Sequence, residues 1–308
     1  MCTYICRFVI PMRKISYTVP PALDGSSVAA VLRSHGFSTA LLRSLKKTYG
    51  ALSLNGCPVR TVDPVHTGDI VAVELNTGGA TAPPSAEKAV IVYADRDILV
   101  VNKRAGMAMY ETYNHHGNAL SNAVAAAGFD GPFRPIYRLD KDTSGLVVLA
   151  RHQLSAAKLA GKVQKDYYAV VPGAYTGSGA VDAPIAHCPD STVKRCVDPA
   201  GVRAVTHWEA LGQQGGRTLL RVQLETGRTH QIRVHFAHLG TPLVGDSLYG
   251  TAPIGARHLL HCKTIRLMHP VREEPVAFDC PFPSDMEEWN QCLPTAPTTS
   301  LPASCCPP

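Results

Sequence analysis

The sequence reads Arg138-Leu139-Asp140-Lys141-Asp142-Thr143-Ser144-Gly145 directly before the apolar run Leu146-Val147-Val148-Leu149-Ala150. The apolar run is short and rich in β-branched residues, which is typical of a buried strand. The polar residues before it predict a turn that carries carboxylates to the end of a sheet. Asp142, Thr143 and Ser144 could serve only to cap their own backbone. Asp140 has Arg138 as a near neighbour and is the stronger functional candidate.

Two further segments downstream contain charged, aromatic and histidine side chains in a recognisable order. They read Lys165-Asp166-Tyr167-Tyr168-Ala169 and Thr226-Gly227-Arg228-Thr229-His230-Gln231-Ile232-Arg233-Val234-His235. Together with the phrase around Asp140, these segments closely resemble the signature of the RNA pseudouridine synthases of the ribosomal-large-subunit type (RluA-like family). The resemblance covers the part of the chain from about residue 90 to about residue 283.

The resemblance implies a role for several residues. Asp140 is the catalytic carboxylate, Arg228 is the guanidinium that pairs with it, and Tyr167 lines the base and could move a proton. Arg138 fills the stack that the target base vacates, although a salt bridge that orients Asp140 is its alternative role. His230 and Arg233 are expected to contact RNA. The implied fold is α+β, with a mixed, mainly antiparallel sheet, flanking helices and a central cleft.

The implied reaction breaks the glycosidic bond of a uridine, rotates the base and rejoins it through carbon 5. Nothing is oxidised or consumed, so no cofactor is expected, and the sequence has neither a P-loop nor a dinucleotide-binding fingerprint. The reaction needs an ionised carboxylate, which burial disfavours and a nearby guanidinium restores. A uridine in a helix must also be flipped out, at a cost of roughly a few kcal/mol.

Three positions depart from the family pattern. Arg104 stands where the family usually has Pro, residues 110–116 replace an expected His-Pro pair, and Tyr137 replaces the His that commonly precedes the RLD triplet. These positions surround the expected RNA entrance, so they bear on which nucleotide is the target. Ribosomal RNA is the favoured substrate and transfer RNA the second choice, and the sequence does not identify the modified uridine.

Residues 1–75 resemble the small S-four-like RNA-binding domain. Apolar residues recur at helical spacing between Ser26 and Leu45, Asn55-Gly56 is the favoured type I′ turn pair, and a strand follows Gly68. The second predicted helix carries Arg43, Lys46 and Lys47, which we expect to contact RNA phosphates. The alternative is that these side chains form only a solvated helix face.

The remaining organisation follows from composition and length. The 308 residues suggest two domains, and the net charge of +6 is compatible with an RNA partner. Residues 76–88 read as a flexible linker, residues 89–292 as the catalytic domain, and residues 293–308 as a disordered tail that contains Cys305 and Cys306. None of the ten cysteines forms a C-x-x-C pair, and no apolar run reaches membrane-spanning length. We therefore expect a monomeric, cytoplasmic protein with reduced thiols.

The histidines near the third motif do not predict a metal site. His230, His235 and His238 lack the H-E-x-x-H spacing, and the pair His115-His116 lies far away in the sequence. We expect Thr229 to be the N-cap of a helix that ends near Gly240. In that helix the histidines would position RNA or pack.

Two other functions remain open at this stage. A non-catalytic RNA-binding ribosome-assembly factor could keep the same fold, although it would have no need for Asp140, Tyr167 and Arg228 together. A glycoside hydrolase also places a carboxylate at an anomeric carbon, but it requires a second catalytic carboxylate. Asp142 is the only obvious candidate for that second group.

Overall fold

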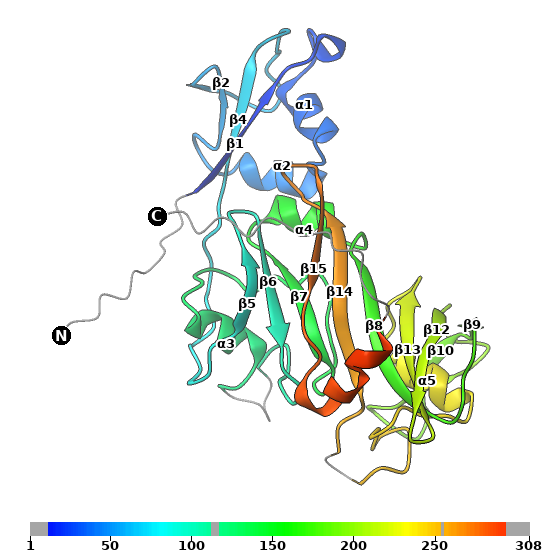
Figure 1. Cartoon of the computed structure of the whole chain (residues 1–308). Coiled ribbons are helices and arrows are strands. Elements are labelled where there is room, and N and C mark those ends of the chain that lie inside the picture. The colour runs from blue at the N-terminus through cyan, green and yellow to red at the C-terminus, as the bar shows by residue number, and fades with distance from the viewer. Residues whose placement is uncertain (1–11, 112–116, 254–255, 294–308) are drawn as a thin grey trace, which may run out of the picture. The chain divides into compact units, whose positions relative to one another are not determined.

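The computed structural model describes residues 12–111, 117–253 and 256–293. The predicted disordered tail lies outside the described residues from position 294 onward. The chain divides into two compact units (Figure 1). The first unit contains the residues up to Asp166 together with His261–Pro281, and the second contains Tyr167–Leu260 and the residues from Phe282 onward.

The N-terminal part of the first unit is a small antiparallel sheet with two helices. Its elements are β1 (Arg13–Thr18), η1 (Pro21–Leu23), α1 (Val28–Ser34), α2 (Thr39–Leu45), β2 (Leu52–Leu54), β3 (Cys57–Pro58) and β4 (Ile70–Leu75), with the strand order β1-β4-β2-β3. The Ser27 and Ser38 hydroxyls accept hydrogen bonds from the backbone and cap the two helices. Asn55 and Gly56 both have positive φ, which confirms the predicted type I′ turn.

This N-terminal part packs directly on the rest of its unit. The apolar faces of α1 and α2 share a hydrophobic core with Leu154. Arg13 of β1 also makes a two-point ion pair with Asp97, with Nε 2.8 Å from one carboxylate oxygen and Nη2 3.1 Å from the other. The small sheet is therefore fixed to the unit by both an apolar and a charged contact.

The second sheet of the first unit carries the motif around Asp140. Its strands are β5 (Val90–Ala94), β6 (Ile98–Lys103), β7 (Ser144–Ala150), β14 (Leu260–Met268) and β15 (Pro275–Asp279), accompanied by α3 (Leu120–Ala126) and α4 (Gln153–Leu159). The order is β5-β6-β7-β14, with β15 also paired to β14. All the pairs are antiparallel except β7 with β14, which is parallel. Every residue of β7 is buried, because this strand has neighbours on both sides.

The segment of residues 76–88 has no helix or strand, as predicted, but it is not a free linker. The carbonyl oxygen of Pro83 accepts a hydrogen bond of 2.7 Å from the amide of Asn122 in α3, and Glu87 makes an ion pair with Arg104. The hydroxyl of Thr81 accepts a hydrogen bond of 2.8 Å from the backbone of Gly131. These contacts hold the segment against its own unit.

The second unit is an antiparallel sheet with a hairpin and one regular α-helix in its described part. Its elements are β8 (Gln164–Pro172), β9 (Ser178–Asp182), β10 (Ile185–His187), β11 (Arg195–Val197), β12 (Val205–Gln214), β13 (Arg217–Leu224), α5 (Gln231–His238) and η2 (Ser284–Cys292). The sheet order is β8-β13-β12-β9, and β10 pairs with β11. Both units therefore have the α+β character that the sequence predicts.

None of the helices in the described part of the chain combines the length and the apolar character that crossing a bilayer requires.

Candidate active site

The turn that carries Asp140 is held in place by a fully buried lysine. Lys103 is the last residue of β6, and its ammonium donates a hydrogen bond of 2.8 Å to the carbonyl oxygen of Lys141. It also donates to the carbonyl oxygens of Met107, at 2.8 Å, and Arg104, at 3.0 Å. An ammonium group tolerates burial only when its donors are used. The residue that follows Asp140 is therefore tied to the end of β6.

The start of β7 approaches β14 so closely that only glycine fits. Gly145 pairs with Cys262 in the parallel ladder, and its backbone has a φ of +118°. A Cβ atom on Gly145 would overlap the backbone of Cys262. The hydroxyl of Ser144 lies 2.9 Å from Nδ1 of His261, so it bonds across the ladder. The end of β7 next to the turn is thus locked against β14.

The three residues of the RLD triplet differ in exposure. Leu139 is buried, Asp140 is half-buried, and Arg138 is exposed. The backbone N–H of Thr143 donates a hydrogen bond of 3.2 Å to the carbonyl oxygen of Asp140 and closes the turn. Within the described part of the chain, the guanidinium of Arg138 makes no hydrogen bond or ion pair. The salt bridge between Arg138 and Asp140 is therefore not formed in this structure.

Two departures from the family pattern lie beside this turn. Burial raises the pKa of Tyr110, and the nearby charge of Arg138 opposes that rise. The Tyr137 hydroxyl donates a hydrogen bond of 2.9 Å to the carbonyl oxygen of Leu146 in β7, and the ammonium of Lys165 lies 4.5 Å from the centre of the Tyr137 ring. Tyr137 therefore packs against the first motif and holds the lysine of the second by a cation–π contact.

In the second unit, Tyr167 lies on β8 opposite Val222 of β13. Its side chain is 6% exposed. Burial of this extent is equally expected for a core tyrosine and for one whose ring lines a pocket. The catalytic role of Tyr167 therefore stays a prediction.

The corner that carries Arg228 is built around Gln231, which the sequence analysis did not single out. The buried side-chain oxygen of Gln231 accepts hydrogen bonds from the Arg228 backbone N–H, at 3.0 Å, and from the Thr226 hydroxyl, at 2.8 Å. Its amide nitrogen donates to the carbonyl oxygen of Val205 at 2.9 Å. The guanidinium of Arg228 is exposed and donates through Nε to the carbonyl oxygen of Arg203 at 3.1 Å.

The predicted N-cap of α5 is wrong by one residue. The N-cap is His230, not Thr229, and it has a left-handed backbone with a φ of 59° and no capping side-chain hydrogen bond. The Gln231 side chain instead bonds the backbone N–H of Arg228 ahead of the helix. The helix ends at His238, and Gly240 follows with positive φ, which agrees with the predicted end.

Arg233 has a different environment from the one expected for an RNA contact. It is 6% exposed, and its guanidinium makes hydrogen bonds of 2.7 and 2.9 Å to the two carboxylate oxygens of the buried Asp246. The guanidinium also lies over the ring of Tyr249, whose hydroxyl is 2.8 Å from Nδ1 of His230. The buried ion pair gives Arg233 a structural role, and its predicted RNA contact stays a prediction. His230 remains partly exposed at the edge of this cluster.

The candidate residues fall in different units. Asp140 and Arg138 belong to the first unit, whereas Tyr167, Arg228 and His230 belong to the second. The predicted pairing of Asp140 with Arg228 would join the two units, and it stays a prediction.

One group among the described residues has the ligand types of a metal site, namely Asp95, Asp97 and His269. Its carboxylate oxygens already accept hydrogen bonds from protein donors. Asp97 accepts from Arg13 and lies 2.9 Å from Nε2 of His152, while Asp95 lies 2.8 Å from Nε2 of His269. These contacts make the group an ion-pair network.

Among the histidines of α5, His235 fits the predicted packing role. Its two ring nitrogens lie within 3.0 Å of protein oxygens.

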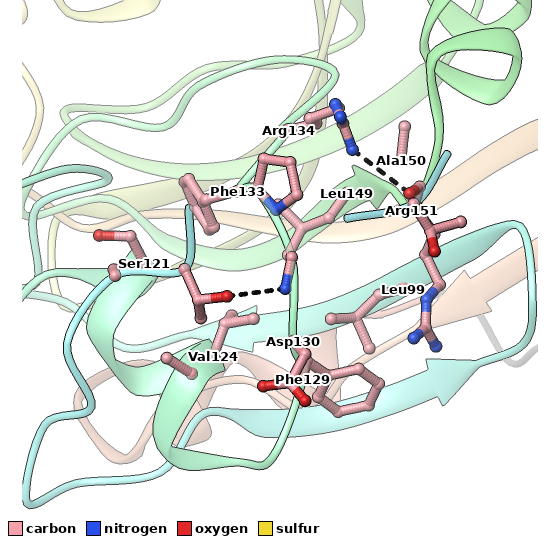
Figure 2. A pocket seen from close by; sticks show the side chains of 16 residues that line it. Leu99, Ser121, Val124, Phe129, Asp130, Phe133, Arg134, Leu149, Ala150 and Arg151 are labelled. Atoms are coloured by element: carbon pink, nitrogen blue, oxygen red, sulfur yellow. Dashed lines mark hydrogen bonds between the residues drawn. The ribbon is translucent and has the colours of Figure 1, made fainter. Parts of the chain in front are cut away.

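Figure 2 shows a small pocket beside Leu149 and Ala150, the last two residues of β7, whereas Asp140 precedes the first residue of that strand. Leu149 and Ala150 line one side of it, and residues 129–134 line the other. Its volume of about 40 Å³ has room for about one water molecule, not for a uracil ring. This pocket is therefore not the site of the uridine.

The predicted RNA-binding residues of the N-terminal sheet are accessible. Arg43 lies on α2, Lys46 is its C-cap, and Lys47 follows, and all three side chains are exposed. This exposure is what a phosphate contact requires, and it is equally expected of a solvated face.

Comparison with known proteins agrees with the motifs. A family model described as RNA pseudouridylate synthase matches residues 97–238, which include Asp140, Tyr167 and Arg228. The chain is 36% identical over 266 residues to the RNA pseudouridine synthase YjbO of Bacillus subtilis (strain 168), an alignment that covers 82% of this chain and 94% of that protein. It is also 36% identical over 302 residues to ribosomal large subunit pseudouridine synthase D of Xanthomonas campestris pv. campestris, covering 89% of this chain and 91% of that protein.

A solved structure shares the fold. Human RNA pseudouridylate synthase domain containing 1 superposes with a TM-score of 0.52 and 26% sequence identity, over 68% of this chain and 89% of that chain. The motifs, the fold and the relatives that match over nearly their whole length lead to one conclusion. The chain belongs to the RNA pseudouridine synthases, enzymes that isomerise uridines in RNA to pseudouridine.

Proposed function

We propose that this enzyme modifies uridines of ribosomal RNA and that Asp140 is its catalytic carboxylate. The choice of ribosomal RNA is supported by relatives from Xanthomonas and Pseudomonas that carry the name ribosomal large subunit pseudouridine synthase D and are 35–36% identical to this chain. A monomer that acts in the cytoplasm is part of the same proposal.

The proposed roles follow the order of the reaction. Arg43, Lys46 and Lys47 contact RNA phosphates and position the substrate without reading its sequence. Arg138, whose guanidinium makes no hydrogen bond or ion pair within the described residues, fills the stack after the uridine has flipped out.

The chemical step is assigned to three side chains. The carboxylate of Asp140 acts at the uridine, as a nucleophile or as a stabiliser of developing positive charge. Arg228 keeps this carboxylate ionised once the pocket is closed to water, and its planar guanidinium can bind both carboxylate oxygens at once. Tyr167 lines the base. Each role rests on the position of the residue in its motif.

The proposal rests mainly on the contacts that hold the turn of Asp140 in place. Its turn is tied to β6 by the buried Lys103 and to β14 by the close approach of Gly145. The Asp140 side chain itself stays half-exposed. A rigid backbone that presents a partly accessible carboxylate is the arrangement that a preorganised catalytic group requires.

The test compares Asp140→Asn with Asp142→Asn, a matched change two residues away in the same turn. RNA transcribed with uridine tritiated at carbon 5 releases tritium when pseudouridine forms. We expect no release from Asp140→Asn, with RNA affinity unchanged, and nearly normal release from Asp142→Asn. Turnover by Asp140→Asn would refute the catalytic assignment. A separate experiment, sequencing-based mapping of pseudouridine in total RNA, would show whether the target is ribosomal or transfer RNA.

A further inference from the structure

Tyr49 is the most exposed large apolar or aromatic side chain in the described part of the chain. It follows the end of α2, in the turn that leads to β2, and is 96% exposed. Within the described residues its hydroxyl makes no hydrogen bond. An aromatic ring of this size is usually buried or held by a partner. Because it is exposed, the Tyr49 side chain contributes nothing to the core of the N-terminal sheet.

A groove lies beside this ring. It is formed by the end of α2 and the turn after it on one side and by residues 58–63 on the other, and its volume is about 580 Å³. That volume falls in the range of roughly 300–1,000 Å³ that is common for ligand pockets. Val62, which also lines the groove, is 65% exposed. The groove therefore has room for one nucleotide and offers both a ring and an aliphatic surface.

The charge of the groove is positive. Lys46 and Arg60 line it, and Lys47 is the neighbour of Lys46 in sequence. Asp63 is the one acidic residue of the lining, and it is ion-paired with Arg60, so Lys46 is the lining cation that has no ion-pair partner among the described residues. The Asp63 carboxylate accepts hydrogen bonds from the backbone N–H of Arg60, at 2.8 Å, and from Nε of the same residue, at 3.1 Å. These two bonds from Arg60 hold the pKa of Asp63 below its usual range.

An exposed aromatic ring in the same groove as a lysine has the chemistry that recognises unpaired nucleotides. Every base has a flat face that can stack on tyrosine, and every nucleotide brings a phosphate for a lysine or an arginine. A base inside a duplex has no free face, and an acidic peptide would use the cations without the ring.

We propose that this groove binds one unpaired nucleotide of the substrate RNA, with its base stacked on Tyr49 and its phosphate held by Lys46. The proposal rests on the enzyme acting on RNA and is separate from the catalytic assignment. It adds a contact with a base to the phosphate contacts of α2. A single-stranded element of the substrate, beside the structure that holds the target uridine, would then be bound at a defined position.

The test uses the full chain, a 12-nucleotide single-stranded RNA and a paired RNA duplex. Tyr49→Ala should weaken binding of the single strand by roughly 5- to 150-fold, the range for loss of one stacked base, and should leave duplex binding unchanged. Tyr49→Phe should bind normally, because stacking needs no hydroxyl. Ile70→Ala removes another exposed apolar side chain of the same small sheet, 48% exposed and outside the groove lining, and should change neither affinity.

The salt dependence of RNA affinity distinguishes the contribution of base stacking from that of phosphate contacts. Tyr49→Ala should keep the slope of log affinity against log salt, whereas Lys46→Ala should reduce that slope by about 0.7 for the single strand. Unchanged single-strand affinity in Tyr49→Ala would overturn the proposal, and so would an equal loss for single strand and duplex. Tritium release should persist in the control Ile70→Ala, which lies outside the groove lining. A wild-type protein that releases no tritium from any RNA would contradict the proposed function instead, whatever the Tyr49 variants bind.

Discussion

The ammonium of Lys103 donates a hydrogen bond of 2.8 Å to the carbonyl oxygen of Lys141, the residue directly after Asp140. The two lysines are 38 positions apart in the chain, and the contact joins the end of β6 to the turn before β7. Lys103 touches neither substrate nor reacting atoms by this contact. It is a positioning residue, which acts through the backbone beside Asp140.

Replacing Lys103 with methionine should disturb the position of the Asp140 turn without changing the affinity for RNA. The variant keeps the volume of the side chain but leaves three carbonyl oxygens without this donor, which should lower the free energy of unfolding by about 2–4 kcal/mol. The single-turnover rate should fall because the turn is no longer held, while the dissociation constant for RNA stays the same. Urea unfolding, single-turnover tritium release and a binding titration measure the three quantities. A normal rate in a folded variant would show that the turn holds without Lys103.

Gly145→Ala should be among the most damaging single changes in this enzyme. The added methyl group meets the backbone of Cys262, and alanine also resists the φ of +118°. We expect a loss of at least about 3 kcal/mol in stability. Gly128→Ala is the matched control, because Gly128 has a φ of +90° and open space around it. It should lose only about 1–2 kcal/mol, and equal losses in urea unfolding would contradict the steric argument.

Gln231→Met should impair catalysis through Arg228. The change removes the acceptor that fixes the Arg228 backbone and should lower kcat by roughly 10- to 100-fold, in line with the effect of losing a supporting residue elsewhere. The measurement is a double-mutant cycle with Arg228→Ala. If Gln231 acts through Arg228, its loss should have little further effect once Arg228 is gone. Fully additive losses would indicate that Gln231 only stabilises the fold.

The stability of the enzyme should depend on His258 in mildly acidic solution. Burial, reinforced by the charge of Arg233, lowers the pKa of His258 to about 3. The folded state then keeps this ring neutral, while the unfolded chain binds a proton below about pH 6.5. Stability should therefore fall between about pH 6.5 and about pH 3, by up to about 1.4 kcal/mol per pH unit from this group.

The check for His258 is the slope of the unfolding free energy against pH. His258→Gln removes the ionisable ring, so its slope in that window should be shallower than that of the wild type. Identical slopes in His258→Gln and the wild type would show that His258 does not titrate as described.

Local sequence patterns predicted the elements whose signals are local. The apolar run became β7, the apolar residues at helical spacing between Ser26 and Leu45 became α1 and α2, and Asn55-Gly56 became the hairpin turn. These features depend on contacts within a few residues, so composition and spacing are sufficient to find them.

The features that were missed depend on distant contacts. Gly145 needs glycine because of Cys262, and the Ser144–His261 hydrogen bond spans 117 positions, which no local pattern encodes. Lys103 could have been noticed as the charged last residue of a mainly apolar strand. The 76–88 segment has a linker's composition, yet its contacts with Asn122 and Gly131 come from folded neighbours.

The parallel pairing of β7 with β14 has a consequence for synthesis of the protein. The ribosome releases the turn that carries Asp140 long before it releases Cys262, which supports the start of β7. A nascent chain therefore has the acidic group but lacks the strand that fixes it. The enzyme can therefore fix the turn of Asp140 only after β14 has emerged from the ribosome, the particle whose RNA we propose it modifies.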